Sequence, residues 1–182
     1  RAPAQSDAKP RAQLAAELAL INRIQQAMAA KLGFQAIVDL VGDTLREMFD
    51  SDDLSLRWWD PDADTVVQIY CVEHGKHLPK GPPVKVRATN KPLTRLLYEG
   101  MGSYLGTREE QLAAGLGGAA PGTDWCLSII GVPIRGAHRV LGCIVIENHE
   151  REHAFGDAEL QALTTIGATL GTALENVRLF DE

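Results

Sequence analysis

Ser128-Ile-Ile-Gly-Val-Pro-Ile134 and Val140-Leu-Gly-Cys-Ile-Val-Ile146, joined by a short turn, decide the fold of this chain. Both runs are apolar on both faces, which predicts two central strands covered by other structure on each side. Pro133 lacks the N–H that a strand ladder uses, so it belongs near a strand end or a bulge. From Asp157 an amphipathic helical pattern continues to the last residue. The last third of the chain therefore predicts a hairpin packed against a long terminal helix.

The first half of the chain predicts two helices followed by a second hairpin. Helical patterns cover residues 11–32 and 34–49, and Gly33 separates them. The apolar period then changes from helical spacing to strict alternation. Residues 54–58 and 66–72 therefore predict the two strands of an antiparallel hairpin.

Between the two hairpins lies an irregular segment, residues 75–126, which holds most of the prolines. Short helical stretches are expected at residues 92–98 and 108–114. Long irregular segments inside a compact domain usually form lids or binding loops. The element order predicts an α+β fold of antiparallel strands, with helices gathered on one face and at both ends of the chain.

Length and composition indicate one acidic globular domain. Residues 1–10, rich in Pro and Ala, are expected to form a disordered linker, which leaves a single domain at residues 11–182. The net charge of −6 disfavours nucleic acid and anionic membranes as partners. No apolar run is long enough for a transmembrane helix. Reduced, buried thiols in a cytoplasmic protein are the best interpretation of the three cysteines, Cys71, Cys126 and Cys143.

Apolar residues repeat at intervals of seven in both terminal helical patterns, which suits pairing with another helix. We therefore predict a homodimer whose interface is formed by Leu14, Leu18, Ile21, Met28, Leu163, Leu170, Leu174 and Val177. The alternative is that both stripes are buried within one chain. Because the helical pattern still runs at Glu182 and the chain starts at Arg1, we also expect an excised module whose output partner lies outside this sequence.

Aromatic and cationic side chains gather around the irregular segment, and this inventory can build a small-molecule pocket. The candidate ligand contacts are Trp58, Tyr70, His74, Arg87, Arg95, Tyr98, Tyr104, Trp125 and Ser128. The alternative is that the aromatic residues only fill space beneath the irregular segment.

Motifs for metal binding and catalysis are weak. Cys71-x-x-His74-x-x-His77 and His149-x-x-x-His153 have ligand-like spacing, but they fall at the ends of different strands, so no metal site is predicted. The glycines of Gly115-x-Gly117-Gly118 lack the flanking strand and helix of a phosphate loop and indicate a flexible lid. No nucleophile elbow occurs. A non-enzymatic role is therefore expected.

Several strings resemble the GAF family of sensory domains. They are Phe34-Gln-Ala-Ile-Val-Asp-Leu40, the two apolar runs quoted above, Phe155-Gly-Asp-Ala-Glu-Leu160 and Ala173-Leu-Glu-Asn-Val-Arg-Leu-Phe180. The resemblance covers roughly residues 14–181. The chain is most similar in appearance to bacterial signalling proteins in which tandem GAF units regulate a kinase or cyclase.

The resemblance implies a GAF/PAS-like central antiparallel sheet with the N- and C-terminal helices packed on one face. The irregular segment would form a roof over the other face, with a small-molecule pocket beneath it. The terminal helices would also build a homodimer. The resemblance further implies a regulatory module that controls a covalently linked kinase or nucleotide cyclase. It does not identify a ligand or cofactor. Asn90-Lys91 is followed by Pro-Leu, which breaks the Asn-Lys-Phe-Asp-Glu signature of cyclic-nucleotide-binding members. The pattern of bilin-attaching members is also missing.

Two alternatives remain within the same fold. One is a ligand-free dimerisation and scaffold module. The other is an enzyme similar to the family's free methionine sulfoxide reductases, which need cysteines in the lid. Cys126 lies at the edge of the irregular segment, whereas Cys71 and Cys143 fall in predicted strands.

Overall fold

The computed structural model describes residues 8–86, 91–118 and 123–181, and these form an α+β domain around one antiparallel sheet. The helices are α1 (Ala8–Ala29), α2 (Phe34–Phe49), α3 (Lys91–Thr94), α4 (Arg108–Ala113) and α5 (Asp157–Asp181), with a π-helical turn η1 (Arg95–Glu99) after α3. The strands are β1 (Leu54–Asp60), β2 (Thr65–Glu73), β3 (Lys76–His77), β4 (Val84–Lys85), β5 (Ser103–Leu105), β6 (Ser128–Arg135) and β7 (Val140–Asn148).

The sheet has the strand order β3-β2-β1-β7-β6-β5, and β4 pairs with the outer edge of β2. Each described strand pair is antiparallel, as the two hairpin patterns predict. The central pair β6 and β7 is buried along most of its length, which confirms the expectation from its two-sided apolar sequence. The two-residue and three-residue strands β3, β4 and β5 were not predicted, because they are too short to show a period.

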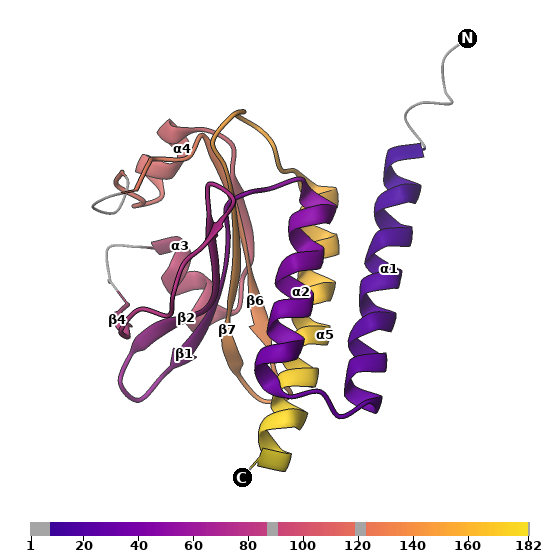
Figure 1. The fold of residues 1–182 in the computed structure, drawn as a ribbon. Coiled ribbons are helices and arrows are strands. Elements are labelled where there is room, and N and C mark those ends of the chain that lie inside the picture. Colours follow the sequence, from indigo (N-terminus) through magenta and orange to yellow (C-terminus); the bar gives the residue numbers. More distant parts are fainter. Residues whose placement is uncertain (1–7, 87–90, 119–122, 182) are drawn as a thin grey trace.

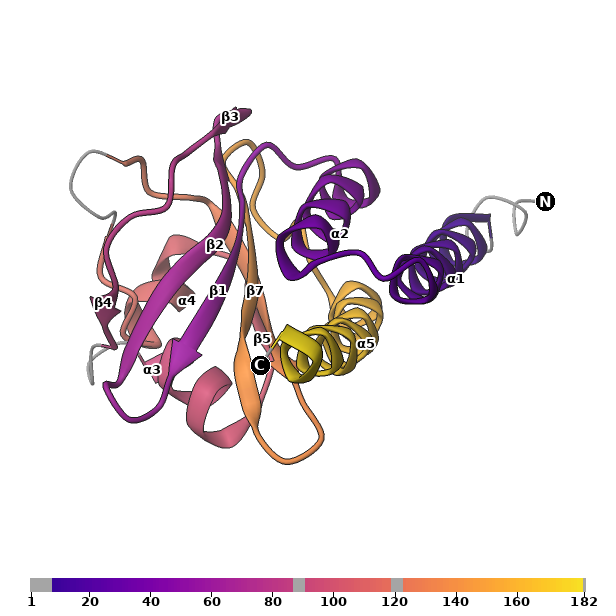
Figure 2. The ribbon, with the colours of Figure 1, turned by 60° about the horizontal axis from the view of Figure 1, so that its bottom comes forward.

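Helices cover the two faces of the sheet unequally (Figure 1). α2 and α5 lie on one face, and α1 packs outside them as a further layer (Figures 1 and 2). The other face carries α3, η1, α4 and residues 123–127, which we call the roof. This arrangement confirms the predicted fold, with both terminal helices on one side and an irregular cover on the other. α1 and α5 run in the same direction, and α2 runs opposite to them (Figure 1).

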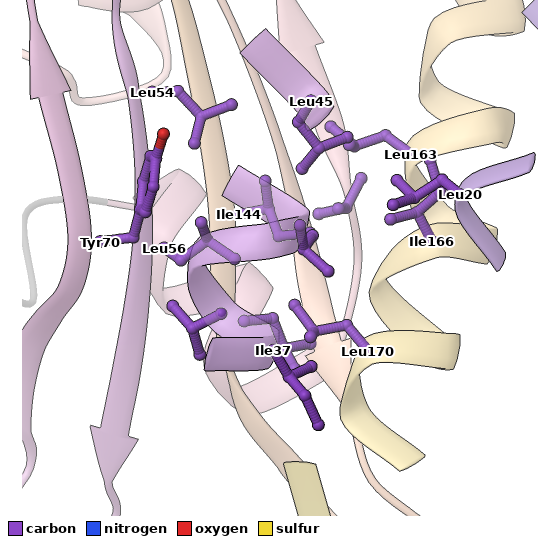
Figure 3. Close-up of a cluster of buried hydrophobic side chains, with 14 of the residues drawn as sticks. Leu20, Ile37, Leu45, Leu54, Leu56, Tyr70, Ile144, Leu163, Ile166 and Leu170 are labelled. Atoms are coloured by element: carbon purple, nitrogen blue, oxygen red, sulfur yellow. The ribbon is translucent and has the colours of Figure 1, made fainter. Parts of the chain in front are cut away.

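The main core fills the space between the sheet and the helices (Figure 3). It is built from aliphatic side chains that are fully buried, among them Ile37 and Leu45 of α2, Leu56 of β1 and Ile144 of β7. Gly42 allows α2 to lie directly on the ring of Tyr70, since a Cβ at this position would overlap the ring. Burying side chains of this size stabilises the fold by about 1.5–3 kcal/mol each, so this layer fixes how the helices sit on the sheet.

The seven-residue stripe of α5 has an explanation within the chain. Leu163, Leu170 and Leu174 are fully buried in the core between α5, the sheet and the other helices, so their side chains offer no surface to a second copy. Val177 is half-buried against the same core. The sequence pattern could not separate burial against a neighbouring helix of another chain from burial against the sheet, because both need an apolar stripe.

The stripe of α1 is different, because α1 has two apolar sides. Leu20, Ile24 and Ala27 are buried towards the core of the domain. Leu14 and Leu18 lie on the other side and are 54% and 53% exposed. The half-buried Ile21 continues that second side at helical spacing, whereas Met28 packs against the core.

Candidate functional site

The roof-facing side of the sheet carries a group of polar side chains near the start of β1. Alternation along β1 turns Ser55 and Arg57 towards the roof, while Leu54 and Leu56 face the helices. Gln68 and Glu73 of β2 and Glu147 of β7 join them from the neighbouring strands. Together with Asp53 they line a cavity of about 40 Å³. We call these six residues, Asp53, Ser55, Arg57, Gln68, Glu73 and Glu147, the polar floor.

The polar floor is acidic. Asp53, Glu73 and Glu147 supply three carboxylates against the single guanidinium of Arg57. Burial raises the pKa of Glu147, and the negative charge of Asp53 acts in the same direction, while Arg57 and His149 oppose the shift. Taking a carboxylate out of water costs free energy unless it is paired. This surplus of negative charge makes the polar floor a place where a positively charged group would be stabilised.

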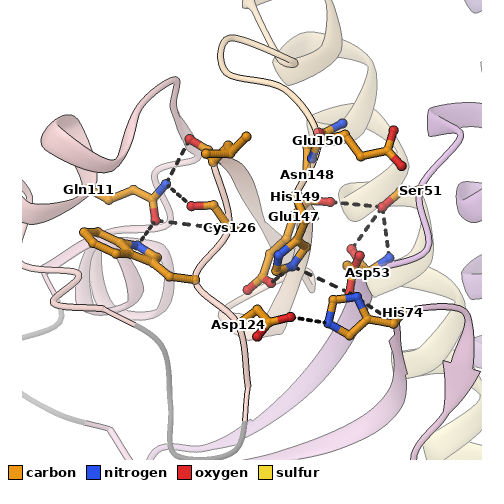
Figure 4. Close-up of polar contacts among 12 residues, drawn as sticks. Ser51, Asp53, His74, Gln111, Asp124, Cys126, Glu147, Asn148, His149 and Glu150 are labelled. Atoms are coloured by element: carbon orange, nitrogen blue, oxygen red, sulfur yellow. Dashed lines mark hydrogen bonds and ion pairs between the residues drawn. The ribbon is translucent and has the colours of Figure 1, made fainter.

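Asp53 is the centre of the contacts at one end of the polar floor (Figure 4). Its Oδ1 accepts a hydrogen bond from the backbone N–H of His74 at 2.9 Å and lies 3.6 Å from Nε2 of His149. The centroids of the His74 and His149 rings are 5.1 Å apart, and Nε2 of His149 lies 3.3 Å from Oε2 of Glu147. The hydroxyl of Ser51 lies 3.1 Å from the backbone oxygens of both Asp53 and Glu147. These contacts fix the carboxylates on β1 and β7 relative to each other.

One contact between an imidazole and a carboxylate joins the roof to the sheet beside the polar floor. Oδ2 of Asp124 lies 3.1 Å from Nε2 of His74, which projects from the turn between β2 and β3 (Figure 4). Both side chains are more than half exposed, so this contact contributes little to stability and can open at low cost. We call this pair, His74 and Asp124, the latch.

A buried amide holds the rest of this roof segment in place. Gln111 of α4 is 2% exposed. Its Nε2 donates to the backbone oxygens of Cys126 and Leu127, and its Oε1 accepts from the indole N–H of Trp125 at 2.9 Å. The guanidinium of Arg108 stacks 5.2 Å from the Trp125 ring and donates to the Trp125 carbonyl. Trp125 is thus a structural anchor of the roof, and the indole is already engaged.

The three cysteines are buried free thiols, as the sequence predicts. Burial raises the pKa of Cys126 to about 12 and that of Cys71 to about 11. Burial likewise raises the pKa of Cys143. The S–H of Cys126 also points at Oε1 of Gln111, 3.5 Å away. Because the thiolate is the nucleophilic form, these environments are unfavourable for sulfoxide reduction.

Two of the sequence-predicted ligand contacts lie on the wrong side of the sheet. The Trp58 ring packs edge-on against Phe34 of α2 at 5.1 Å, beneath the guanidinium of Arg178. The Tyr70 hydroxyl donates to Asp43 of α2 at 2.7 Å. Both residues therefore belong to the helix-facing core. Trp58 follows Leu54 and Leu56 on the helix side by alternation along β1, whereas a bulge at Ile69 of β2 interrupts the alternation next to Tyr70.

Other predicted contacts have structural partners away from the polar floor. Ser128 is fully buried, and its hydroxyl lies 2.9 Å from the carbonyl of Arg151. Tyr98 donates to Asp64, Tyr104 donates to Asp157, and Arg95 pairs with Glu99. Arg87 lies outside the described residues.

Of the predicted residues that the structure describes, His74 lies beside the polar floor, where its backbone N–H donates to Asp53, whereas Trp125 contacts Gln111 and Arg108 in the roof. Sequence reasoning missed the polar floor itself. The available signal was the pair of polar residues, Ser55 and Arg57, at alternate positions in an otherwise apolar strand.

Within the described residues, no three His, Cys, Asp or Glu side chains are arranged to hold a metal ion. No helix in that same part of the chain is long and apolar enough to cross a bilayer.

Comparison with protein families gives one match, the GAF domain, over residues 33–174. No curated protein matches the chain. The solved structures that resemble it include part of a methyl-accepting chemotaxis protein and the GAF domains of a cyanobacterial phytochrome and of a Pseudomonas syringae protein described as a sensor histidine kinase.

Three of these structures illustrate the range. The GAF domain of a phosphoenolpyruvate-protein phosphotransferase from Coxiella burnetii superposes with a TM-score of 0.69 at 18% identity, covering 91% of this chain and 96% of that one. The phycoerythrobilin-bound GAF domain of a cyanobacterial phytochrome gives 0.69 at 16%, covering 91% and 98%. Free methionine-R-sulfoxide reductase from Neisseria meningitidis gives 0.64 at 15%, covering 88% and 89%. At these identities the likeness concerns the fold.

Proposed function

The chain belongs to the GAF domain family, and we propose that it is a regulatory module that senses a small, positively charged molecule at the polar floor. Residues 11–182 would form this single sensory domain, in the cytoplasm, as part of a longer protein. The observation that carries the proposal is the excess of carboxylates in a partly closed cavity on the roof side of the sheet.

The floor also sets the chemistry and size of the ligand. A primary ammonium group carries three N–H donors, and each charge-assisted bond that it makes to a carboxylate of the polar floor is stronger than a neutral one. The cavity of about 40 Å³ has room for roughly three waters, if each needs ~10–15 Å³. An ammonium head group is of that size.

Binding at the polar floor would be transmitted through the sheet. Leu54 and Ile146 neighbour Asp53 and Glu147 in β1 and β7, and both pack into the core beneath α2 and α5. A ligand that prefers one arrangement of the roof and these strands shifts the population of helix arrangements on the opposite face. We propose that α1 carries this shift across a homodimer to a covalently linked output domain, a kinase or nucleotide cyclase.

Thermal unfolding tests the proposal with a series of primary amines, from methylammonium to spermidine, at constant ionic strength. A ligand that binds the native state raises the melting temperature, by mass action. We expect one or more amines to stabilise the wild type and to lose this effect in Glu147→Gln. Glu150→Gln is the matched control, because this exposed residue follows the same strand and the substitution removes the same charge. Stabilisation that survives Glu147→Gln, or none with any amine, would reject the polar floor as the site.

A ligand-free scaffold is the second candidate, and the small size of the cavity favours it. In that case the polar floor is a set of satisfied contacts between β1, β2 and β7. The two candidates differ in the latch variant His74→Ala. If the polar floor is a binding site, opening the latch changes amine affinity. If the module is a scaffold, the substitution leaves the amine response absent in both proteins.

A further inference from the structure

The His74 ring lies between two carboxylates that belong to different layers of the domain (Figure 4). Its Nε2 is 3.1 Å from Oδ2 of Asp124 in the roof, and its Nδ1 is 3.9 Å from Oδ1 of Asp53, just before β1. Each ring nitrogen therefore faces negative charge. From this placement we propose that a proton on His74 closes the latch, and that the module thereby senses pH.

The two protonation states of the ring differ in what they can do at this position. A neutral imidazole has one N–H and one lone pair, so one of its nitrogens presents a lone pair to a carboxylate. The imidazolium form donates from both nitrogens and places a positive charge between two negative ones. Imidazole is also the side chain that ordinarily changes its charge between pH 5 and 8. Protonation of His74 therefore strengthens the attachment of the roof to the sheet.

The backbone around His74 holds the ring in this position. The residue has a φ of 48°, in the left-handed region that few residues other than glycine adopt. Its N–H donates to Oδ1 of Asp53 at 2.9 Å, and the N–H of Gly75 donates to the carbonyl of Asp52 at 3.0 Å. These bonds tie the turn between β2 and β3 to the turn before β1, and neither of them involves Asp124. Opening the latch thus leaves the turn in place.

A second imidazole shares the carboxylate on the sheet side of the latch. Nε2 of His149 is 3.6 Å from Oδ1 of Asp53 and 3.3 Å from Oε2 of Glu147. Because Asp53 contacts both rings, protonation of one ring affects protonation of the other. Asp53, Glu147 and Asp124 supply three carboxylates for the two rings, which can offset the charge of both imidazolium groups.

Other charged groups around the two rings do not reverse this balance. Arg57 of β1 acts on Glu147 with a positive charge, and Glu73 of β2 adds a further carboxylate to the same cavity. Asp52 is paired with Arg46 of α2 at 3.4 Å. The charged residues on the adjoining turns are exposed and screened by water, and these are Lys76, Glu150 and Arg151.

The rest of roof segment 123–127 is held by groups whose charge does not change near neutral pH. The amide of Gln111 donates to two backbone oxygens of this segment, and Arg108, which stays protonated, donates to the carbonyl of Trp125. Asp124 is therefore the point at which a proton on His74 acts on the segment. The proposal goes beyond amine sensing, because it requires no ligand and is tested without one.

Hydrogen exchange of the whole chain at about pH 7.5 and about pH 5.5, corrected for intrinsic exchange rates, tests the proposal. We expect the protection of residues 123–127 to rise by about threefold at the lower pH, which is the size of effect that an exposed charge pair supplies. His74→Asn removes the titrating ring and keeps a residue type that tolerates positive φ. Asp124→Asn removes the carboxylate of the roof instead. In each variant the protection of the roof should no longer depend on pH.

His138→Asn is the matched control, because this exposed histidine lies in the turn between β6 and β7, at the other end of β7 from His149. It should respond to pH as the wild type does. Amides of the buried strand β6 show whether the stability of the whole domain changes. Roof protection that is the same at both pH values, that rises equally in β6, or that still responds to pH in His74→Asn or Asp124→Asn would overturn the proposal.

Discussion

We predict that two copies of the chain form a dimer through the exposed apolar side of α1. Leu14 and Leu18 lie on the side of α1 that faces away from the core and are 54% and 53% exposed. Fully burying a leucine contributes about 2 kcal/mol, so burying the exposed half contributes about 1 kcal/mol. Two copies bring four such leucines together, which amounts to about 4 kcal/mol of dimer stability.

The double variant Leu14→Ala, Leu18→Ala removes most of this apolar surface and keeps a good helix former at both positions. Since each 1.4 kcal/mol changes an equilibrium constant about tenfold, we expect the dimer dissociation constant to rise by roughly a thousandfold. Sedimentation equilibrium over a wide range of protein concentrations measures this constant. The monomer should stay folded, because neither side chain contributes to the buried core.

Leu112→Ala is the matched control. This leucine of α4 is 56% exposed and lies on the roof side of the sheet, so its loss should leave the dissociation constant unchanged. A wild-type protein that stays monomeric at the highest concentrations would refute the reasoning. So would a double variant that dimerises as tightly as the wild type, because the interface would then lie elsewhere.

Three further predictions concern stability and the thiols. Gly42→Ala should lower the free energy of unfolding in urea by about 1–2 kcal/mol, because overlap with the Tyr70 ring costs about 1–3 and helix propensity returns about 0.5–1; an unchanged value would mean that the ring moves aside freely. Because burial raises the pKa of Cys126 to about 12 from 9.0, its thiolate fraction at pH 8 is about a thousandfold below that of a free thiol. All three cysteines should therefore react slowly with a thiol reagent until the protein is denatured, and a fast native thiol would revive the enzymatic interpretation. Since burial raises the folded-state pKa of Glu147, its contribution favours folding at low pH and is lost as pH rises through that pKa. Glu147→Gln should thus raise the melting temperature at pH 7 relative to wild type, with a difference that shrinks towards pH 4; a variant less stable at pH 7 would contradict the stated burial.

The sequence carried enough information to predict the layers of the fold. The two-sided apolar runs of β6 and β7 and the stripe of α2 each allow one structural interpretation, because strands and helices bury residues at different periods. Very short strands left no such signal. The stripes of α1 and α5 were harder, since an apolar side does not say which surface covers it, and α5 proved to be buried within its own chain.

The candidate site was harder to predict than the fold, for two physical reasons. An aromatic residue in a strand covered on both sides packs equally well on either face, so Trp58 and Tyr70 were assigned to the roof although they face α2. The polar floor, in turn, is assembled across strands. Glu147 reaches Asp53 only because β7 pairs with β1 in the register that places Leu54 opposite Ile146. A single sequence does not give that register.

Hydrogen exchange of the whole chain, with and without the amine that stabilises it most, tests the central claim most directly. We predict slower exchange at the polar floor and in residues 123–127, together with changed exchange in α1 and α5 on the opposite face. Unchanged exchange at the polar floor, or protection there with identical exchange in both helices, would contradict it.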